Sequence, residues 1–582
     1  MPFDGITWPD VHVLAGVGGN ADPGAAYLHL GVGPGLGTGL LGGTTYVDIT
    51  ADVNSAIIKR GRDSDIDSAT PGSCVLVVDN SSGIYDPTNL ATPFWGPNLL
   101  TTQQESLEDG TTTGWQAGQD TSIANTAAQA YHGTKALQLT KTVGTGTAFA
   151  QAGVGMTGVP FPPSAPCRLS VWFRTAATAR QCKIRGAFHT MSGTYLSGQD
   201  LLSNAVTDAT TGWVQATITG RSPAQSTRLV PELQVAGCVN TEVHYADRIR
   251  IEQGGIDAGT PFKVRAEWPI GTVYDRFTGT LADVSLDLGY DPTVTFTCAD
   301  GLETLGRAQL PVTAAQYDSD TTGQRIGHLA DQAVWPTSLR SLDTGYTTLG
   351  PTILGDFALN LMRKVEQTEF GLLYVNGAGV LVFYDRHRSA TATRSINVQA
   401  AFTDTQGASE IEMASLDVAK NRDRLINDVH ITRDPDPFGE DTPVEQVATD
   451  LESVDHYDGT FSMPAQLGLV CRNDYDALAM AQGLLPWFRD VVLRIREVKI
   501  EAITQGQWTV LLPLTLLDLI SLSRDYGPVT VAAQLLIQAL AEEIRFDPDP
   551  AWNFTFTMSN LPPSPDLWIL GTSAIGSGRL GW

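Results

Sequence analysis

The feature that most constrains this fold is an interruption. A strand-and-turn pattern stops near residues 93–98, and an equivalent pattern resumes near Pro261. Residues 98–257, which lie between, carry 11 Lys and Arg against 11 Asp and Glu, whereas the rest of the chain carries 26 against 52. The net charge of -26 therefore lies entirely outside this stretch. We interpret residues 98–257 as a complete β-sandwich inserted into another module, whose two halves pair across it.

The length and composition predict several mainly-β domains. A chain of 582 residues exceeds what one hydrophobic core supports. Its 58 Gly, its many Thr, Ser and Val and its 17% of charged residues are typical of short strands joined by tight turns. We therefore expect a mainly-β, α+β multidomain protein with a few helices.

Local sequence patterns predict several strands and helices. Alternation of apolar and polar residues predicts a half-buried strand, and apolar residues at helical spacing predict a helix. Two apolar runs that flank turn residues predict a hairpin. These segments are strands at 294–298 and 552–558, helices at 359–366 and 474–490, and a hairpin turn at 376–379. We predict five parts: residues 1–98 with 258–310 as a first barrel, 99–257 as the sandwich, 311–390 as an α+β domain, 391–562 as a second barrel that contains the helix 474–490, and 563–582 as a tail.

The acidic composition excludes some partners. With a pI near 4.6, the chain lacks the clustered Lys and Arg that neutralise phosphates, so direct nucleic-acid recognition is not expected. No run approaches the roughly 20 apolar residues that span a bilayer. Residues 1–10 lack the basic and apolar regions of a secretion signal, so we expect synthesis in the cytoplasm.

No catalytic signature stands out. The nine His form no HExxH, HxH or His-Cys pattern, and no G-x-S-x-G elbow has supporting partners. We therefore expect no catalytic residues and no enzymatic activity. The six Cys lack metal-like spacing and are expected to be buried free thiols. The alternative is a bridge inside the insert, Cys167–Cys182 or Cys182–Cys238.

The C-terminal segment LPPSPDLWILGTSAIGSGRLGW is too short to form its own core. It is either a disordered end or a segment that docks on a neighbouring protein. We favour docking because four of its apolar residues look exposed. These residues are Trp568, Ile569, Leu570 and Trp582.

The frame around the insert resembles the tail-tip hub proteins of long-tailed bacteriophages, the baseplate-hub or tail-associated-lysin type of minor tail protein. The matching segments are DVNSAIIKRGRDSD with PGSCVLVVDNSSGIYDPTN, FTGTLADVSLDLG with VTFTCADGLETLG, and ALNLMRKVEQTEFGLLYVNGAGVLVFYDR. The end WILGTSAIGSGRLGW is similar to C-termini of minor tail proteins from phages of actinobacteria.

This resemblance implies a virion protein at the tail tip, in which three copies form a ring beneath the tail tube and each copy supplies two similar barrels. The implied partners are the distal tail protein ring, the C-terminus of the tape-measure protein, and the central fibre or other minor tail proteins. The alternative that we keep open is an extracellular carbohydrate-binding or glycan-degrading protein in which the sandwich is the main working part.

The insert is similar to the carbohydrate-binding jelly rolls of many glycosidases, through AYHGTKALQLT, CRLSVWFRT, TTGWVQATITG and VHYADRIRIEQG. Sugar binding would need an exposed aromatic ring, and our candidates are Tyr131, Trp172 and Tyr195. Trp172 and Phe173 are adjacent on a predicted strand and so face opposite sides. The ligand implied for a tail protein is a glycan of the host cell wall.

Such modules often hold a structural calcium ion, and the resemblance maps its ligands onto Glu108 and Asp247. Hard oxygen ligands near the two ends of the insert would tie those ends together. The alternative is that both residues are solvated surface carboxylates. We expect no other cofactor.

Overall fold

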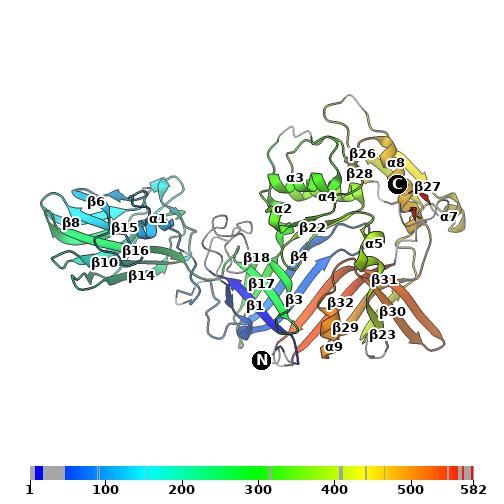
Figure 1. The fold of residues 1–582 in the computed structure, drawn as a ribbon, viewed down its shortest axis with the longest axis horizontal. Helices are drawn as coiled ribbons and strands as arrows, with labels where there is room; N and C mark the ends of the chain where they lie inside the picture. Colours follow the sequence, from blue (N-terminus) through cyan, green and yellow to red (C-terminus); the bar gives the residue numbers. More distant parts are fainter. Residues whose placement is uncertain are drawn as a thin grey trace.

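The structure is a computed structural model and describes residues 5, 7–17, 46–87, 89–90, 92–96, 98–153, 155–312, 317–404, 410–439, 442–463, 466–546, 549–560, 567–568 and 579–580. Strands predominate and helices are few (Figure 1), so the mainly-β prediction is confirmed. The inserted sandwich lies at one end of an elongated molecule and the remaining elements lie at the other (Figure 1).

Strands on both sides of the insert belong to one sheet. β1 pairs with β17, and β4 pairs with β19, so residues before 98 and after 261 share a ladder of hydrogen bonds. The seven strands of this first module are β1 (Asp10–Gly16), β2 (Tyr46–Asp48), β3 (Val53–Gly61), β4 (Thr70–Asp79), β17 (Pro261–Glu267), β18 (Val273–Asp287) and β19 (Thr293–Ala299).

A second module continues the same sheet. Its strands are β23 (Val398–Thr403), β24 (Glu410–Glu412), β25 (Ser415–Ala419), β29 (Arg494–Glu501), β30 (Leu519–Tyr526), β31 (Val529–Arg545) and β32 (Ala551–Asn560), and α9 (Gln505–Leu511) packs beside them. β31 is long enough to pair with β30 along its first half and with β3 along its second half, while β32 lies on its other side. The two modules therefore form one 14-stranded sheet.

This continuity corrects the expectation of two closed barrels. No closed barrel is present among the strands that the structure describes. Closing the first module into a barrel would have required the free edge of β3, but that edge pairs with β31 instead. The antiparallel β3–β31 pairing runs from Ser55 opposite Arg545 to Gly61 opposite Ala539. A single hydrophobic core, with members from both modules, covers this seam.

A buried ionic cluster lies at the seam. The Arg276 guanidinium of β18 donates to both carboxylate oxygens of Glu542 of β31, at 2.6 and 2.9 Å. Arg60 of β3 lies 3.7 Å from the same carboxylate. Burial and the neighbouring Arg276 together lower the pKa of Arg60 to about 10, although Glu542 opposes the change. One carboxylate of β31 thus compensates two buried cations, one from β18 and one from β3.

The insert is a two-sheet sandwich with a core of its own. One sheet has the order β14 (Val214–Arg221), β10 (Pro166–Thr175), β16 (Val243–Gln253), β7 (Ala136–Lys141) and β6 (Thr121–Thr126). The other has the order β12 (Leu201–Leu202), β11 (Gln181–His189), β15 (Arg228–Val239), β8 (Thr145–Gln151) and β5 (Gln116–Ala117), with β13 (Val206–Thr207) on β11 and β9 (Val159–Pro160) on β15. A short helix, α1 (Thr102–Ser106), packs on β16.

A two-stranded stem joins the sandwich to the large sheet. The Gly96 N–H donates to the carbonyl of Gln253 at 2.7 Å, and the Gly255 N–H donates to the carbonyl of Phe94 at 2.8 Å. Phe94 and Ile256 are buried in the core of the large sheet, so the boundary of the sandwich lies just inside these two residues.

The remaining elements form two smaller units. The first contains α2 (Gly301–Arg307), α3 (Thr322–Gln332), α4 (Ala358–Glu369), β20 (Arg340–Leu342), β21 (Leu372–Val375) and β22 (Leu381–Tyr384), followed by α5 (Arg388–Thr391) and α6 (Thr393–Ile396). The second contains β26 (Asp428–Arg433), β27 (Gln446–Thr449), β28 (Gln466–Leu469), α7 (Leu451–His456) and α8 (Asp474–Phe488). The predicted helices and the 376–379 hairpin are confirmed in α4, α8 and the β21–β22 turn.

Candidate functional sites on the inserted sandwich

The outer face of the five-stranded sheet carries an aromatic cluster. On β10, Phe173 points into the core and Trp172 points outward, as their adjacency predicts. Tyr131, from the loop before β7, stacks on Trp172 with ring centroids 4.1 Å apart and planes 14° apart. Trp213 meets Tyr131 edge to face at 6.0 Å. Two of the three predicted aromatic residues therefore lie together.

The third predicted residue, Tyr195, lies on the other sheet. Cys182, Ile184 and Phe188 of β11 are buried, so Arg185 between them points outward. Its guanidinium lies 5.5 Å from the ring centroid of Tyr195 and donates to the Tyr195 hydroxyl at 2.6 Å. The predicted trio is therefore divided between the two outer faces of the sandwich.

Around Tyr195 the structure places the polar groups that sugar hydroxyls require. Tyr195 donates to Asp200 at 2.6 Å, and Arg185 donates to Asp200 at 2.7 Å and to Glu232 at 3.1 Å. Gln234 donates to Glu232 at 2.5 Å. The hydrogen bond to Asp200 raises the pKa of Tyr195, and its burial acts in the same direction, so the hydroxyl stays protonated. A ring that is 38% exposed thus lies within a fixed polar network.

Glu108 and Asp247, the predicted calcium ligands, both contact the loop that carries Tyr131. Asp247 accepts the backbone N–H groups of Tyr131 and His132 at 2.6 and 2.8 Å. Glu108 accepts the backbone N–H and the hydroxyl of Thr134 at 3.0 and 2.8 Å. The two carboxylates therefore orient loop 131–135, and calcium at this place stays a prediction.

The pKa values of these two carboxyl groups shift in opposite directions. Burial raises the pKa of Asp247, against the effect of its backbone hydrogen bonds. Burial also acts to raise the pKa of Glu108, but its hydrogen bonds to the Thr134 side chain and to the backbone of Lys135 and Thr134 lower it overall. Glu108 is therefore the more readily ionised of the two carboxyl groups that hold the loop.

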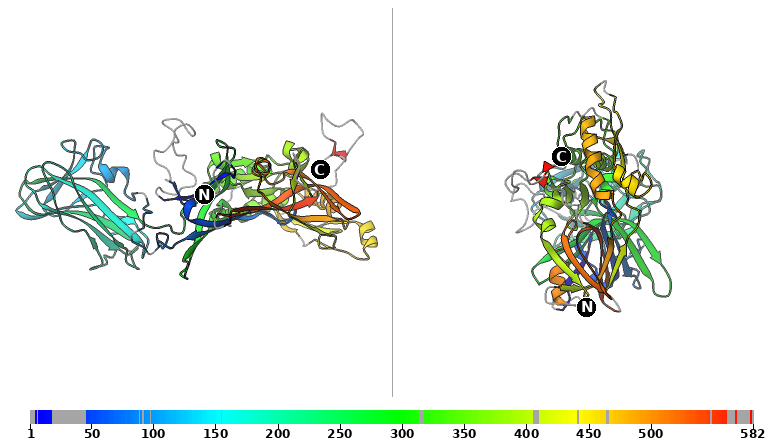
Figure 2. Two further views of the ribbon diagram at one scale, coloured as in Figure 1. Left: turned by 90° about the horizontal axis from the view of Figure 1, so that it is seen from below. Right: turned by 90° about the vertical axis from the view of Figure 1, so that its right-hand side faces the viewer.

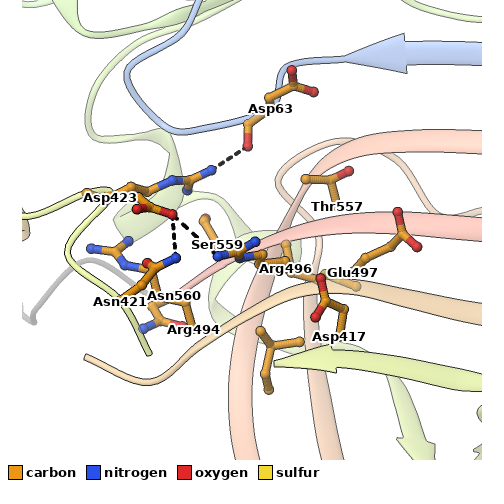
Figure 3. Close-up of a pocket in the computed structure, with 13 residues that line it drawn as sticks. Asp63, Asp417, Asn421, Asp423, Arg494, Arg496, Glu497, Thr557, Ser559 and Asn560 are labelled. Carbon is orange, nitrogen blue, oxygen red and sulfur yellow. Dashed lines mark hydrogen bonds and ion pairs between the residues drawn. The ribbon is translucent and has the colours of Figure 1, made fainter. Parts of the chain in front are cut away.

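A polar pocket of about 380 Å³ lies between the loop after β3 and strands β25, β29 and β32 (Figure 3). Three arginines and four acidic residues line it together with neutral groups. Arg424 donates to the backbone carbonyl of Asp63 at 2.8 Å, and the Arg496 guanidinium lies 3.6 Å from the Asp423 carboxylate. The hydrogen bond from Arg424 to Asp63 thus links the two modules of the large sheet at this pocket.

The predicted docking segment falls largely beyond what the structure describes. Trp568 belongs to β33 (Leu567–Trp568), which pairs in parallel with β34 (Arg579–Leu580). Ile569, Leu570 and Trp582 lie outside the described residues. Among the residues that are described, no helix is long and apolar enough to cross a membrane. All six cysteines are free and buried, as predicted, so neither of the alternative bridges is formed.

The chain matches no known protein family and no curated protein. Among solved structures it is similar to the CBM22-1 xylan-binding domain of Xyn10C from Paenibacillus barcinonensis, with 20% identity over 28% of this chain and 96% of that domain and a TM-score of 0.23. It is also similar to the 43 kDa tail protein of prophage MuSo2 from Shewanella oneidensis, with 13% identity over 52% of this chain and 85% of that chain and a TM-score of 0.35.

A tail protein from Neisseria meningitidis MC58 is similar over 67% of this chain and 96% of its own length, with 11% identity and a TM-score of 0.36.

Sequence reasoning missed several residues of these clusters. Trp213 was one of several aromatic residues of the insert, and its spacing does not distinguish it from core residues. Arg185, Asp200 and Glu232 lie on separate strands and loops. The strand pairing of Arg185 with Glu232 and with Leu202, which follows Asp200, brings them together. A signal was present in β11, where the charged Arg185 falls between buried apolar positions.

Proposed function

We propose that this chain is a structural virion protein, a homotrimeric tail-tip hub of a long-tailed bacteriophage. It joins the tail tube to the central fibre or receptor-binding apparatus and carries no catalytic activity. Its neighbours are the distal tail protein ring, the tape-measure C-terminus and other minor tail proteins. The inserted sandwich extends outward and binds a glycan of the host cell wall.

The observation that carries this proposal is the arrangement of the sandwich relative to the sheet. The β3–β31 pairing unites two strand modules in a single sheet, and the sandwich is attached to it through one two-stranded stem (Figure 1). A continuous sheet can serve as a rigid frame of a ring, while an appendage with its own core can present a ligand site without disturbing that frame.

Assembly contacts are favoured at the tip of the β18–β19 hairpin. Tyr290 is fully exposed and Leu288 is 74% exposed in the turn of this hairpin, which extends away from the rest of the large sheet (Figure 2). Large apolar residues that are exposed together in one turn are typical of protein interfaces.

We expect the double variant Leu288→Ser/Tyr290→Ser to weaken the trimer. Removing an apolar anchor from an interface costs about 2 kcal/mol or more, which is about 30-fold in the dissociation constant. Light scattering after size-exclusion chromatography measures the mass, and Val143→Ser, which changes an exposed apolar residue at a sandwich turn, is the control. A wild-type chain that stays monomeric at every concentration would count against the hub.

Glycan binding is assigned to the Tyr195 face because it combines an exposed ring with hydrogen-bonding groups. We expect Tyr195→Ala to lower the affinity for glycan at least tenfold, because losing the stacking of a sugar ring on the aromatic ring costs about 1.4 kcal/mol or more of binding free energy. The probes are purified actinobacterial cell walls and soluble xylan, measured by co-sedimentation and calorimetry. Tyr131→Ala, on the opposite sheet, is the matched control.

The same experiments distinguish the tail-tip hub from the alternative function. A monomer that binds polysaccharide tightly through Tyr195 would favour an extracellular carbohydrate-binding protein. Loss of binding in Tyr131→Ala with full binding in Tyr195→Ala would instead transfer the site to the stack of Tyr131 on Trp172.

A further inference from the structure

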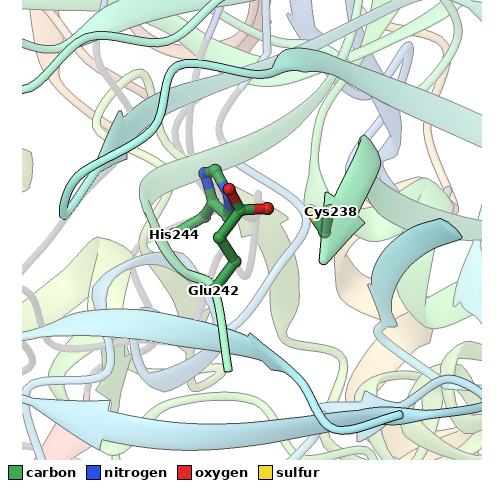
Figure 4. A group of neighbouring side chains, drawn as sticks. All are labelled: Cys238, Glu242 and His244. Carbon is green, nitrogen blue, oxygen red and sulfur yellow. The ribbon is translucent and has the colours of Figure 1, made fainter. Parts of the chain in front are cut away.

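Three side chains with metal-binding atoms converge at one end of the sandwich (Figure 4). Cys238 belongs to the end of β15, His244 to the start of β16, and Glu242 to the turn between them. The thiol sulfur, an imidazole nitrogen and a carboxylate oxygen all lie within 4.8 Å of one another. Because β16 runs from this turn towards the stem at Gly254, the group lies at the end of the sandwich that is remote from the large sheet.

His244 is oriented as a metal-binding histidine. Its Nδ1 lies 2.6 Å from the Asp208 carboxylate, and both side chains are fully buried. The other oxygen of Asp208 accepts the backbone N–H of Arg180 at 2.6 Å, which fixes the carboxylate. A carboxylate on one nitrogen leaves the lone pair of the other nitrogen free for a metal ion, and metal-binding histidines commonly have this partner.

The remaining nitrogen of His244 has no nitrogen or oxygen partner. Its Nε2 is buried, and within the described part of the chain one side chain that approaches it is the Cys238 thiol, which bonds only weakly. A buried polar atom without a partner is rare and requires an explanation. Cys238 and Glu242 are the groups that approach it, and a cation shared by all three would satisfy it.

The charges of the cluster are suited to a divalent ion. Glu242 is held by Arg180, with Nη2 to Oε1 at 2.9 Å and Nε to Oε2 at 3.1 Å, and by the Val239 N–H at 2.7 Å. With an ion bound, Cys238 is a thiolate and His244 is neutral, so the three anions Cys238, Glu242 and Asp208 exceed the one cation, Arg180, by two charges. A divalent ion brings this group to neutrality.

We propose that Cys238, Glu242 and His244 bind a zinc ion, which ties β15 to β16 at the outer end of the sandwich. One sulfur, one nitrogen and one oxygen are ligands that zinc accepts in tetrahedral sites, with the fourth position taken by water. Asp208 acts as a positioning residue through His244. The spacing Cys-x3-Glu-x-His brings together ligands from two consecutive strands, one in each sheet, and from the turn between them.

The test uses the full-length chain, stripped with a chelator and titrated with Co²⁺ and Zn²⁺. We expect one Co²⁺ per chain with the absorption of a thiolate-to-cobalt charge transfer, displaced by Zn²⁺, and one bound zinc in the native mass spectrum. Cys238→Ser should abolish the charge-transfer band, and Asp208→Asn should weaken zinc binding 10- to 100-fold. Cys167→Ser, which removes another buried thiol of the sandwich, should leave both unchanged.

Zinc should also raise the melting temperature of the sandwich in the wild type and in Cys167→Ser but not in Cys238→Ser. A wild-type chain that shows no charge-transfer band would overturn the proposal, whether or not the variants fold. Zinc affinity that is unchanged in Cys238→Ser would overturn it too, because the metal would then lie elsewhere.

Discussion

Replacing Glu542 with Gln is expected to lower the free energy of unfolding of the large sheet by about 3 kcal/mol or more, because removing one partner leaves buried charges uncompensated. Glu542 is the carboxylate that pairs with Arg276 and lies beside Arg60. The substitution keeps the shape of the side chain and removes only its charge. Chemical denaturation, followed by tryptophan fluorescence of the large sheet, measures the change.

The neighbouring Glu543→Gln provides the matched control. Glu543 is exposed on the same strand, so its substitution should change the free energy of unfolding by about 0.5 kcal/mol or less. Equal effects of the two substitutions would show that the buried cluster does not stabilise the seam between β3 and β31. Because the cluster connects β18, β3 and β31, its loss should also favour separation of the two modules.

Deleting residues 99–253 and closing the stem with a short linker is expected to remove one complete unfolding transition and leave the other at its original temperature. The sandwich core shares no member with the core of the large sheet, so the two unfold as separate cooperative units. Differential scanning calorimetry of the full chain, the deletion variant and the isolated sandwich measures both transitions.

The position of the cut is decisive for this experiment. A longer deletion, of residues 93–257, also removes Phe94 and Ile256 from the core of the large sheet. It should destabilise that sheet by at least about 3 to 5 kcal/mol, which is the usual cost of removing a single large buried side chain. If the shorter deletion unfolded the sheet as well, the sandwich would be an integral part of the frame rather than an appendage.

Much of the local structure follows from the sequence. In β32 the alternation of residues 552–558 matches the burial of Trp552, Phe554, Phe556 and Met558, because successive side chains of a strand point to opposite sides. The opposite orientations of Trp172 and Phe173 follow for the same reason. The helix α4 could likewise be predicted from the helical spacing of its apolar residues. The turn at Gly379, which has a φ of +83°, could be predicted from its turn residues.

The pairing of strands that are far apart in the chain could not be predicted from the sequence. The expectation of two barrels failed because the edge of β3 pairs with β31, nearly the whole length of the chain away. Alternation shows which face of a strand is buried but not which strand lies beside it, since many apolar strands have equivalent patterns. The candidate zinc ligands lie close together in the sequence, whereas the contact of Asp208 with His244 comes from a different loop and was not accessible.

By itself, the sequence determined that this protein is mainly β, that a neutral sandwich interrupts an acidic frame, and which residues of each strand face a core. These features depend on the backbone period and on burial, which act between neighbours in the chain. Only the tertiary structure decided that the two modules form one sheet, that Tyr131 and Tyr195 lie on opposite faces, and that Cys238, Glu242 and His244 meet. The first two outcomes depend on which distant strands pair, and the pattern of a single strand does not specify its partner. The third depends on how the turn between β15 and β16 folds.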